Sequence, residues 1–266
     1  MIWELCRQEG IKLFTQKYPY FLLGLILVVQ AGVMIFTATA PAETTLDVVT
    51  GPQLFAKGAG WGLQLGFYLI LVIGAMGFSQ EFSLGTVKTV LVLPVRRFQW
   101  VAAKILFLVM LAALLLLAVT LLAVLIVALT IGWGDVVIEN QVLFTAGVVR
   151  RQVLVAIALT LVFLLPVCAF GLLVGLFFNS SGAAVGTALM LGIVAQTAVG
   201  LFGEKSGKYF FFFHLFRPIS NIERMGKLHH FQWEPVLTWG LGSTLISFAV
   251  FTAWIILKME RMDISG

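Results

Sequence analysis

Charged residues are scarce in this chain of 266 residues. Only 11% of them are Asp, Glu, Lys or Arg, and 61% are hydrophobic, whereas an ordinary soluble domain is about 25% charged and roughly 45 to 50% apolar. This composition excludes a soluble enzyme. The 17 basic and 12 acidic residues leave a net charge of +5. That charge is spread too thinly to form a nucleic-acid-binding face, so we expect no nucleic acid partner.

Cysteine is also scarce, and a common nucleotide-binding motif is missing. The two cysteines, Cys6 and Cys168, make neither a disulfide framework nor a metal site. His214, His229 and His230 lack a further cysteine or a suitably spaced carboxylate, so we expect no metal. No GxxxxGK loop followed by Ser or Thr occurs, so this chain cannot hold ATP phosphates in that way. We therefore expect no cofactor in this chain.

Long apolar runs are the main feature that the sequence does have. Six of them approach or exceed the roughly 20 residues that a membrane-spanning helix needs: 19–39, 61–78, 105–131, 153–178, 182–203 and 236–257. They predict an all-α, polytopic membrane protein with a single transmembrane domain over residues 1–266. None contains Asp, Glu, Lys or Arg, which argues against intramembrane catalysis and against proton- or ion-coupled transport.

Basic residues around the first two runs predict the orientation. Only Lys57 lies between these runs, whereas seven basic residues flank their other ends: Arg7, Lys12, Lys17, Lys88, Arg96, Arg97 and Lys104. Basic residues favour the cytoplasmic side of a membrane, and the number of runs is even. We therefore expect both termini to be cytoplasmic, in a bacterial cytoplasmic (inner) membrane. Over the whole chain the split is nine basic residues inside and eight outside, so the first hairpin carries this prediction.

The first 18 residues repeat with a helical period. One side of the helical wheel collects Ile2, Trp3, Cys6, Gly10, Leu13 and Phe14, and the other collects Glu4, Gln8, Lys12 and Gln16. This pattern predicts an amphipathic helix that lies in the membrane interface. Leu5 and Ile11 break the pattern, so a polar tail with accidental periodicity is the alternative.

Segment 79–104, between the second and third runs, is the most informative part of the chain. Its notable residues are, in order, Glu81, Gly85, Thr86, Pro94, Arg96, Arg97 and Lys104. We expect a polar break at 79–83 to end the second span and residues 86–93 to form about two helical turns before Pro94 forces a bend. A simpler alternative is that the arginines only contact lipid phosphates and fix the topology.

This order of residues after a second span resembles the signature of permease subunits of type 2 ABC transporters, the exporter-like class that shares its fold with the sterol and multidrug half-transporters. In that family the segment is a coupling helix that docks on a nucleotide-binding subunit. The resemblance implies coupling roles for Glu81, Gly85, Thr86, Pro94, Arg96 and Arg97. It also implies a separate ABC ATPase subunit that binds ATP and Mg, and a second permease protomer in a homo- or heterodimer. The function would be ATP-driven export, with lipid-like or amphipathic substrates favoured.

Two other classes of function remain open on the sequence. One is a non-transporting membrane scaffold or assembly factor, and the other is an intramembrane transferase. Both remain because the number of helices alone is no evidence of transport. An ATPase that co-purifies with the chain would favour the exporter permease over these two classes.

Segment 204–235, before the last run, is rich in aromatic residues. We expect it to enter the outer leaflet as short or re-entrant helices broken at Pro218, because water would not tolerate so much exposed aromatic surface. The run Phe210, Phe211, Phe212 and Phe213 would form an outer gate or, alternatively, a static lid. Gln30, Gln64 and Gln196 would line a pathway, with hydrogen bonding between helices as the alternative.

Pairs of small residues mark the fourth and fifth runs. Gly171 and Gly175, and likewise Gly182 and Gly186, are spaced to let helix backbones approach closely. We expect packing within one protomer to explain these pairs better than a dimer seam does.

Overall fold

The computed structural model describes residues 2–39, 49–85, 96–138, 141–226, 233 and 236–261. Within these residues, six helices are long and apolar enough to cross a membrane. This confirms the six predicted spans. The helices are α2 (Tyr18–Thr39), α3 (Gly51–Ser83), α5 (Arg97–Thr130), α6 (Ala146–Gly175), α7 (Ser181–Gly207) and α10 (Leu241–Arg261), the last preceded by a π-helical turn, η2 (Val236–Gly240).

Helices α3 and α6 form the centre of the bundle, and glycines let them approach closely. A Cβ atom added to Gly74 of α3 would lie 3.0 Å from the Cα atom of Gly171 on α6. A Cβ atom on Gly175 would overlap the carbonyl oxygen of Ala75. The prediction that Gly171 and Gly175 serve packing within one chain is therefore confirmed. Gly186 on α7 has nothing near its Cβ position within 4 Å.

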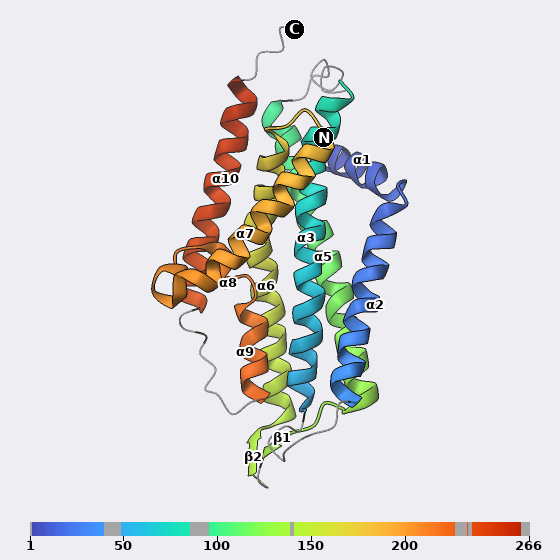
Figure 1. The fold of residues 1–266 in the computed structure, drawn as a ribbon, viewed down its shortest axis with the longest axis vertical. Helices are drawn as coiled ribbons and strands as arrows, with labels where there is room; N and C mark the ends of the chain where they lie inside the picture. Colours follow the sequence, from blue (N-terminus) through green and yellow to red (C-terminus); the bar gives the residue numbers. More distant parts are fainter. Residues whose placement is uncertain are drawn as a thin grey trace.

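Helix α10 ends at the end of the bundle where the first helix begins (Figure 1). Helix α1 (Ile2–Phe14) lies across this end and packs against α5. The opposite end carries an antiparallel hairpin of β1 (Val136–Ile138) and β2 (Gln141–Phe144). The fold is mostly helical, as predicted, and this hairpin was not predicted.

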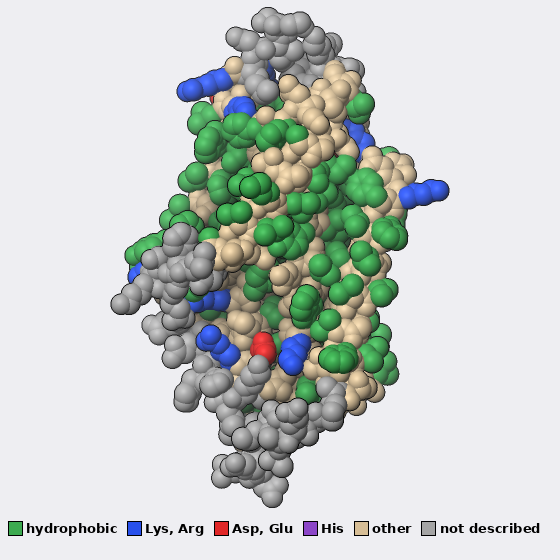
Figure 2. All heavy atoms as spheres, in the orientation of Figure 1, with side chains coloured by type: hydrophobic (Ala, Val, Ile, Leu, Met, Phe, Trp, Pro, Cys, Tyr) green, Lys and Arg blue, Asp and Glu red, His purple; other side chains and the backbone are tan. Residues whose placement is uncertain are grey.

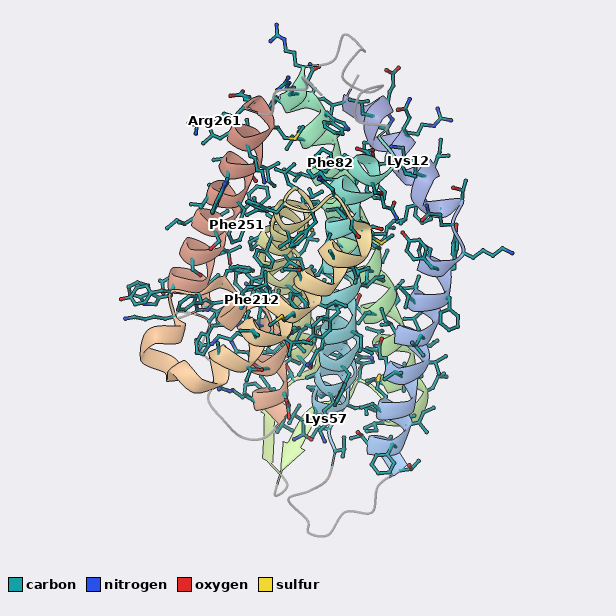
Figure 3. All side chains as sticks on the ribbon, turned by 45° about the horizontal axis from the view of Figure 1, so that its top comes forward. Lys12, Lys57, Phe82, Phe212, Phe251 and Arg261 are labelled. Atoms are coloured by element: carbon teal, nitrogen blue, oxygen red, sulfur yellow. The ribbon has the colours of Figure 1, made fainter. Side chains whose placement is uncertain are left out.

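The surface between the two ends is largely apolar. Figure 2 shows hydrophobic side chains over the middle of the molecule, with lysine and arginine side chains towards both ends. Large exposed side chains on α2 include Phe21, Val28 and Phe36. Figure 3 places Lys12 and Arg261 at one end and Lys57 at the other. A band of exposed apolar side chains between charged ends indicates a membrane protein.

Helices α3 and α5 extend beyond the predicted spans. The second span ends within the predicted polar segment 79–83, because α3 ends at Ser83, but the segment itself is helical. The Ser79 hydroxyl donates to the carbonyl oxygen of Ala75 at 2.6 Å. Serine tolerates a helix interior when it bonds in this way. As a result, Glu81 and Lys104 lie inside long helices. The short helix predicted at 86–93 falls outside the described residues.

Segment 204–235 forms two short helices that pack against the bundle. Helix α8 (Phe211–His214) and helix α9 (Arg217–Gly226) follow the end of α7, and α9 lies along α3 and α6 (Figure 1). Two short helices were predicted with a break at Pro218, and the break lies at 215–216, directly before it. Pro218 occupies the first turn of α9, where a missing amide costs no hydrogen bond. Most of residues 227–235 lie outside the described part of the chain.

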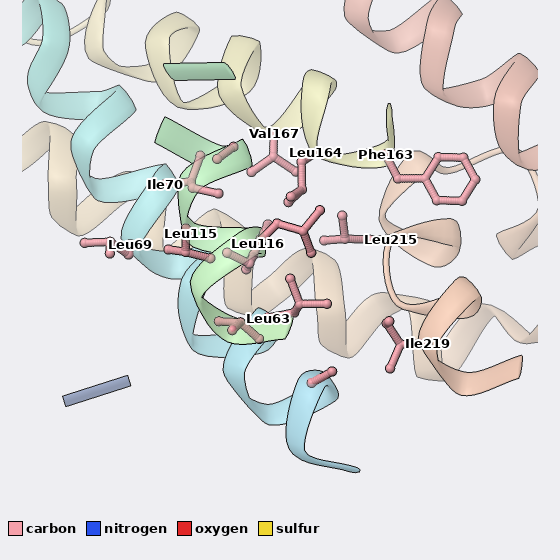
Figure 4. Close-up of a cluster of buried hydrophobic side chains, with 14 of the residues drawn as sticks. Leu63, Leu69, Ile70, Leu115, Leu116, Phe163, Leu164, Val167, Leu215 and Ile219 are labelled. Atoms are coloured by element: carbon pink, nitrogen blue, oxygen red, sulfur yellow. The ribbon is translucent and has the colours of Figure 1, made fainter. Parts of the chain in front are cut away.

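A common hydrophobic core holds these short helices in place. Figure 4 shows Leu215 and Ile219 facing Leu116 of α5 and Val167 of α6, with Ile70 of α3 close by. All five side chains are buried. Burying a side chain of this kind contributes about 1.5 to 3 kcal/mol. Helices α8 and α9 are therefore part of the bundle and not a loose loop.

Candidate functional site

Four charged side chains from three helices meet where α1 crosses the bundle, and we name Glu9, Lys12, Glu81 and Lys104 the charge cluster. The Lys104 Nζ atom lies 3.0 Å from Glu9 Oε1 and 3.1 Å from Glu81 Oε1. It also donates a hydrogen bond of 2.7 Å to the carbonyl oxygen of Gly77. Lys104 is only 2% exposed. A charge this deeply buried is costly unless it is paired, and here two carboxylates and a carbonyl surround it.

Lys12 completes the cluster from its exposed side. Its Nζ atom lies 2.8 Å from Glu81 Oε1 and 3.2 Å from Glu9 Oε1. Burial alone would raise the pKa of Glu9, but Lys104 and Lys12 together hold this pKa below its ordinary value. Burial would lower the pKa of Lys12, but its bonds to Glu81 and Glu9 raise it above the ordinary value. Glu9 and Lys12 are therefore charged at neutral pH and attract each other.

The surroundings of the charge cluster suit a structural joint better than a binding site. The Lys104 Nζ atom lies 5.2 Å from the ring centroid of Phe78 and 5.3 Å from that of Trp100, which is cation–π distance. The cavity beside the cluster measures about 70 Å³. It can hold a few water molecules, whereas ligand pockets measure roughly 300 to 1,000 Å³.

A second tie joins α5 to the last helix at the same end. Arg97 Nη1 donates to the carbonyl oxygens of Met259 and Glu260, at 2.6 and 3.1 Å. The neighbouring Arg96 and Phe98 are exposed. The start of α5 is thus bonded to α10 through Arg97, while Arg96 faces outwards.

The six predicted coupling residues differ in their environments. Glu81 is buried in the charge cluster and Arg97 is bonded to α10. Arg96 is exposed, and Gly85 has a left-handed backbone with φ of +67°, which glycine adopts without strain. Thr86 and Pro94 lie outside the described residues.

An open cleft lies beside α3, and we name it the aromatic cleft. Its volume is about 410 Å³, within the range of ligand sites. It brings together Gln64 and Gln196 with two members of the predicted gate. Gln30 is elsewhere: it is buried and donates a hydrogen bond of 2.8 Å to the carbonyl oxygen of Val119. The side chains lining the cleft are Gln64, Gln196, Phe212, Phe213, Phe216, Arg217, Ser220 and Arg224.

Two glutamines connect α3 to α7 at the cleft. Gln64 Nε2 lies 3.4 Å from Gln196 Oε1, and the Tyr68 hydroxyl donates to the same oxygen at 3.1 Å. The Gln196 Nε2 atom is buried and has no hydrogen-bond partner within the described part of the chain. A buried amide donor without an acceptor is costly, so this atom suits an oxygen supplied by a ligand or by water.

The four consecutive phenylalanines have different environments. Phe212 meets Phe67 and Phe170 edge-on, with ring centroids 5.8 and 5.9 Å apart. Phe211 is buried, and its ring centroid lies 5.7 Å from that of Phe251 on α10. Phe210 is 52% exposed. The run therefore fastens α8 to α3, α6 and α10, and only its last two members face the cleft.

Sequence reasoning missed the roles of three residues. Glu9 lies on the face of α1 that carries the buried Cys6 and Leu13, and its spacing of three from Lys12 was the available signal. Arg217 and Arg224 were likewise not singled out as a pair. Their spacing of seven residues places them on one helix face, which was the signal for a shared site.

The residues that the structure describes contain no group of three or more His, Cys, Asp or Glu side chains that could hold a metal ion. His214 is buried, and its Nε2 atom lies 2.9 Å from the carbonyl oxygen of Lys208. His229 and His230 lie outside the described residues.

The fold and these two features define a class: a six-helix membrane protein with a charged joint at one end and an aromatic cleft beside its central helix. A family model described as a protein of unknown function (DUF2705) matches residues 17–265. The chain belongs to this family. No curated protein matches it.

Proposed function

We propose that this chain is the membrane-spanning permease subunit of an ATP-driven ABC exporter, working as a dimer with two separate ATPase subunits. The observation that carries the proposal is the charge cluster, because it joins α1 to the two helices that border residues 84–96. That segment is where the family resemblance puts the ATPase contact. A force applied there would move α1, α3 and α5 together.

Helix α3 is the element that would carry this motion to the cleft. Glu81 and Gln64 lie 17 positions apart on the same helix, which corresponds to about 25 Å along its axis. Gln64 is bonded to Gln196 of α7, so a tilt of α3 relative to α7 changes the shape of the aromatic cleft. The hydrogen bond from Arg97 to α10 would make α10 move together with α5. Rigid-body rocking of this kind is a common mode of switching.

The orientation that we propose puts α1, the α3–α5 junction and both termini on the cytoplasmic side, following the basic residues of the first hairpin. The aromatic cleft would then open in the outer half of the membrane. Substrate would leave sideways past Phe212 and Phe213, from a site whose wall is both apolar and polar.

The direct test is association with an ATPase. The tagged chain is purified from its native membrane, and ATP hydrolysis is measured in the eluate. Arg96→Glu should abolish ATPase recovery without lowering the thermal stability of the chain, because this side chain is exposed next to the proposed docking segment.

The matched control makes the same change at the other end. Arg151→Glu reverses the charge of an exposed arginine near the start of α6, and it should leave ATPase recovery unchanged. Absence of ATPase from the unmodified chain would reject the exporter in favour of a membrane scaffold. Equal recovery with both variants would reject the docking role of Arg96.

A further inference from the structure

One side of the aromatic cleft is cationic. Arg217, Ser220 and Arg224 stand three and four residues apart on α9, so they share one helix face, and all three line the cleft. The opposite face of α9 is buried through Ile219 and Ile222. Among the described residues that line the cleft, none is Asp or Glu. This side of the cleft therefore attracts anions.

The arginines are suited to binding an oxyanion. The guanidinium carbon of Arg217 lies 4.0 Å from the ring centroid of Phe213, and this stacking orients the guanidinium plane. Arg224 lies seven residues further along α9, on the same helix face, and is exposed. Guanidinium groups present paired N–H donors that match the oxygens of phosphate and carboxylate groups.

The remaining walls are suited to a hydrocarbon chain and one further acceptor. Phe212 and Phe216 both meet Phe67 edge-on, with ring centroids 5.8 and 6.4 Å apart, so they form a fixed aromatic wall. The Gln196 Nε2 atom is a buried donor with no partner within the described residues. A ligand that combines an anionic head with an apolar tail would use all of these groups at once.

We propose that the aromatic cleft binds an amphiphile with an anionic phosphate or carboxylate head group. The head group contacts Arg217 and Arg224 and accepts a hydrogen bond from Gln196, while the apolar tail lies along Phe212 and Phe216. That this amphiphile is exported rests on the proposed function, whereas its binding does not. A metal cation is a poor fit because the described residues that line the cleft include no carboxylate.

The test is equilibrium binding of radiolabelled decyl phosphate to the purified chain in phosphatidylcholine nanodiscs, without an ATPase. The unmodified chain should bind it saturably. Arg217→Gln combined with Arg224→Gln should weaken binding at least about tenfold, as expected for the loss of charge-assisted hydrogen bonds. The control pair Arg150→Gln and Arg151→Gln, on exposed arginines of α6, should bind as the unmodified chain does.

Competition experiments define the ligand class. Decanol tests the tail alone and inorganic phosphate tests the head alone, and neither should compete as well as unlabelled decyl phosphate. Equal competition by decanol, or by inorganic phosphate, would overturn the proposal. Phosphatidylglycerol in the nanodisc distinguishes the sources: if it competes, the anionic amphiphile is a bilayer lipid, and if it does not, the amphiphile is a separate molecule.

Folding defects are separated from binding defects by the single variant Arg224→Gln, whose side chain is exposed. It should keep the thermal stability of the unmodified chain and still weaken decyl phosphate binding. Unchanged binding in both the single and the double variant would overturn the proposal. Failure to find an ATPase would reject the exporter function alone, because binding is measured without one.

Discussion

Replacing Lys104 with methionine should release α1 from the bundle. Methionine keeps the unbranched shape of the buried side chain up to Cε but removes the ammonium group that contacts Glu9, Glu81 and the carbonyl oxygen of Gly77. Breaking a buried ion pair by removing one partner typically costs about 3 to 5 kcal/mol. Lys12 stays within 3.2 Å of Glu9 and closer to Glu81, so we expect the lower limit of that range, about 3 kcal/mol.

The native cysteines provide the assay. Cys6 is 3% exposed on α1, with its Sγ atom 4.0 Å from the Met110 Sδ atom of α5. Burial and the nearby Glu9 raise the pKa of its thiol, which slows its reaction while α1 is docked. A loss of about 3 kcal/mol corresponds to roughly a hundredfold larger open population. Cys6 of the Lys104→Met variant should therefore react about a hundredfold faster with a maleimide, measured by mass spectrometry.

Two comparisons make this result specific. Cys168, 1% exposed in α6, reports unfolding of the whole bundle, and its labelling rate should change much less than that of Cys6. Lys12→Met removes an ammonium that contacts the same carboxylates but is 54% exposed, and exposed pairs contribute only about 0 to 1 kcal/mol. Unchanged Cys6 labelling in Lys104→Met, or an equal effect of Lys12→Met, would refute the reasoning.

Three further outcomes are expected. Because the pKa of Glu9 in the folded chain lies below its ordinary value of 4.5, its contribution to stability is complete above about pH 4.5 and is lost as the pH falls below that value; the thermal midpoint should fall there in the unmodified chain and less so in Glu9→Gln. In a variant without native cysteines, Ser83→Cys should react with an impermeant maleimide only after cells are opened and Val142→Cys in intact cells, and the reverse pattern would overturn the orientation. Phe211→Ala should lower the free energy of unfolding by about 3 to 5 kcal/mol because its ring is buried. Phe212 faces the cleft, so Phe212→Ala should also alter decyl phosphate binding. Loss of stability without altered binding would make Phe212 an anchor only.

The sequence alone determined the number of spans and the fact that α1 and the last turn of α10 share one end of the bundle. Whether a stretch can cross a membrane depends on the apolarity of about 20 consecutive residues, which is a local property. An even number of spans then returns the chain to the side where it began. The face of α1 that carries Cys6 and Leu13 was readable for the same reason, because helical periodicity is local.

The sequence placed Glu81 and Lys104 outside the predicted spans. Their charges ended the predicted spans, yet α3 and α5 continue through both residues. A hydropathy profile assigns each charge its full cost of burial, whereas here Lys104 pairs with Glu81 and Glu9. Pairing offsets much of this cost, and only the tertiary structure supplies the partner.

The tertiary structure also decided which residues share a site. Glu9 and Lys104 are 95 positions apart, and Gln64 and Gln196 are 132 apart. Such contacts depend on how each helix is rotated about its axis and how far it is shifted against its neighbours, and apolar helices fit together in many such arrangements. Close approach at Gly171 selects one of them, because only a residue without a side chain admits another backbone so near.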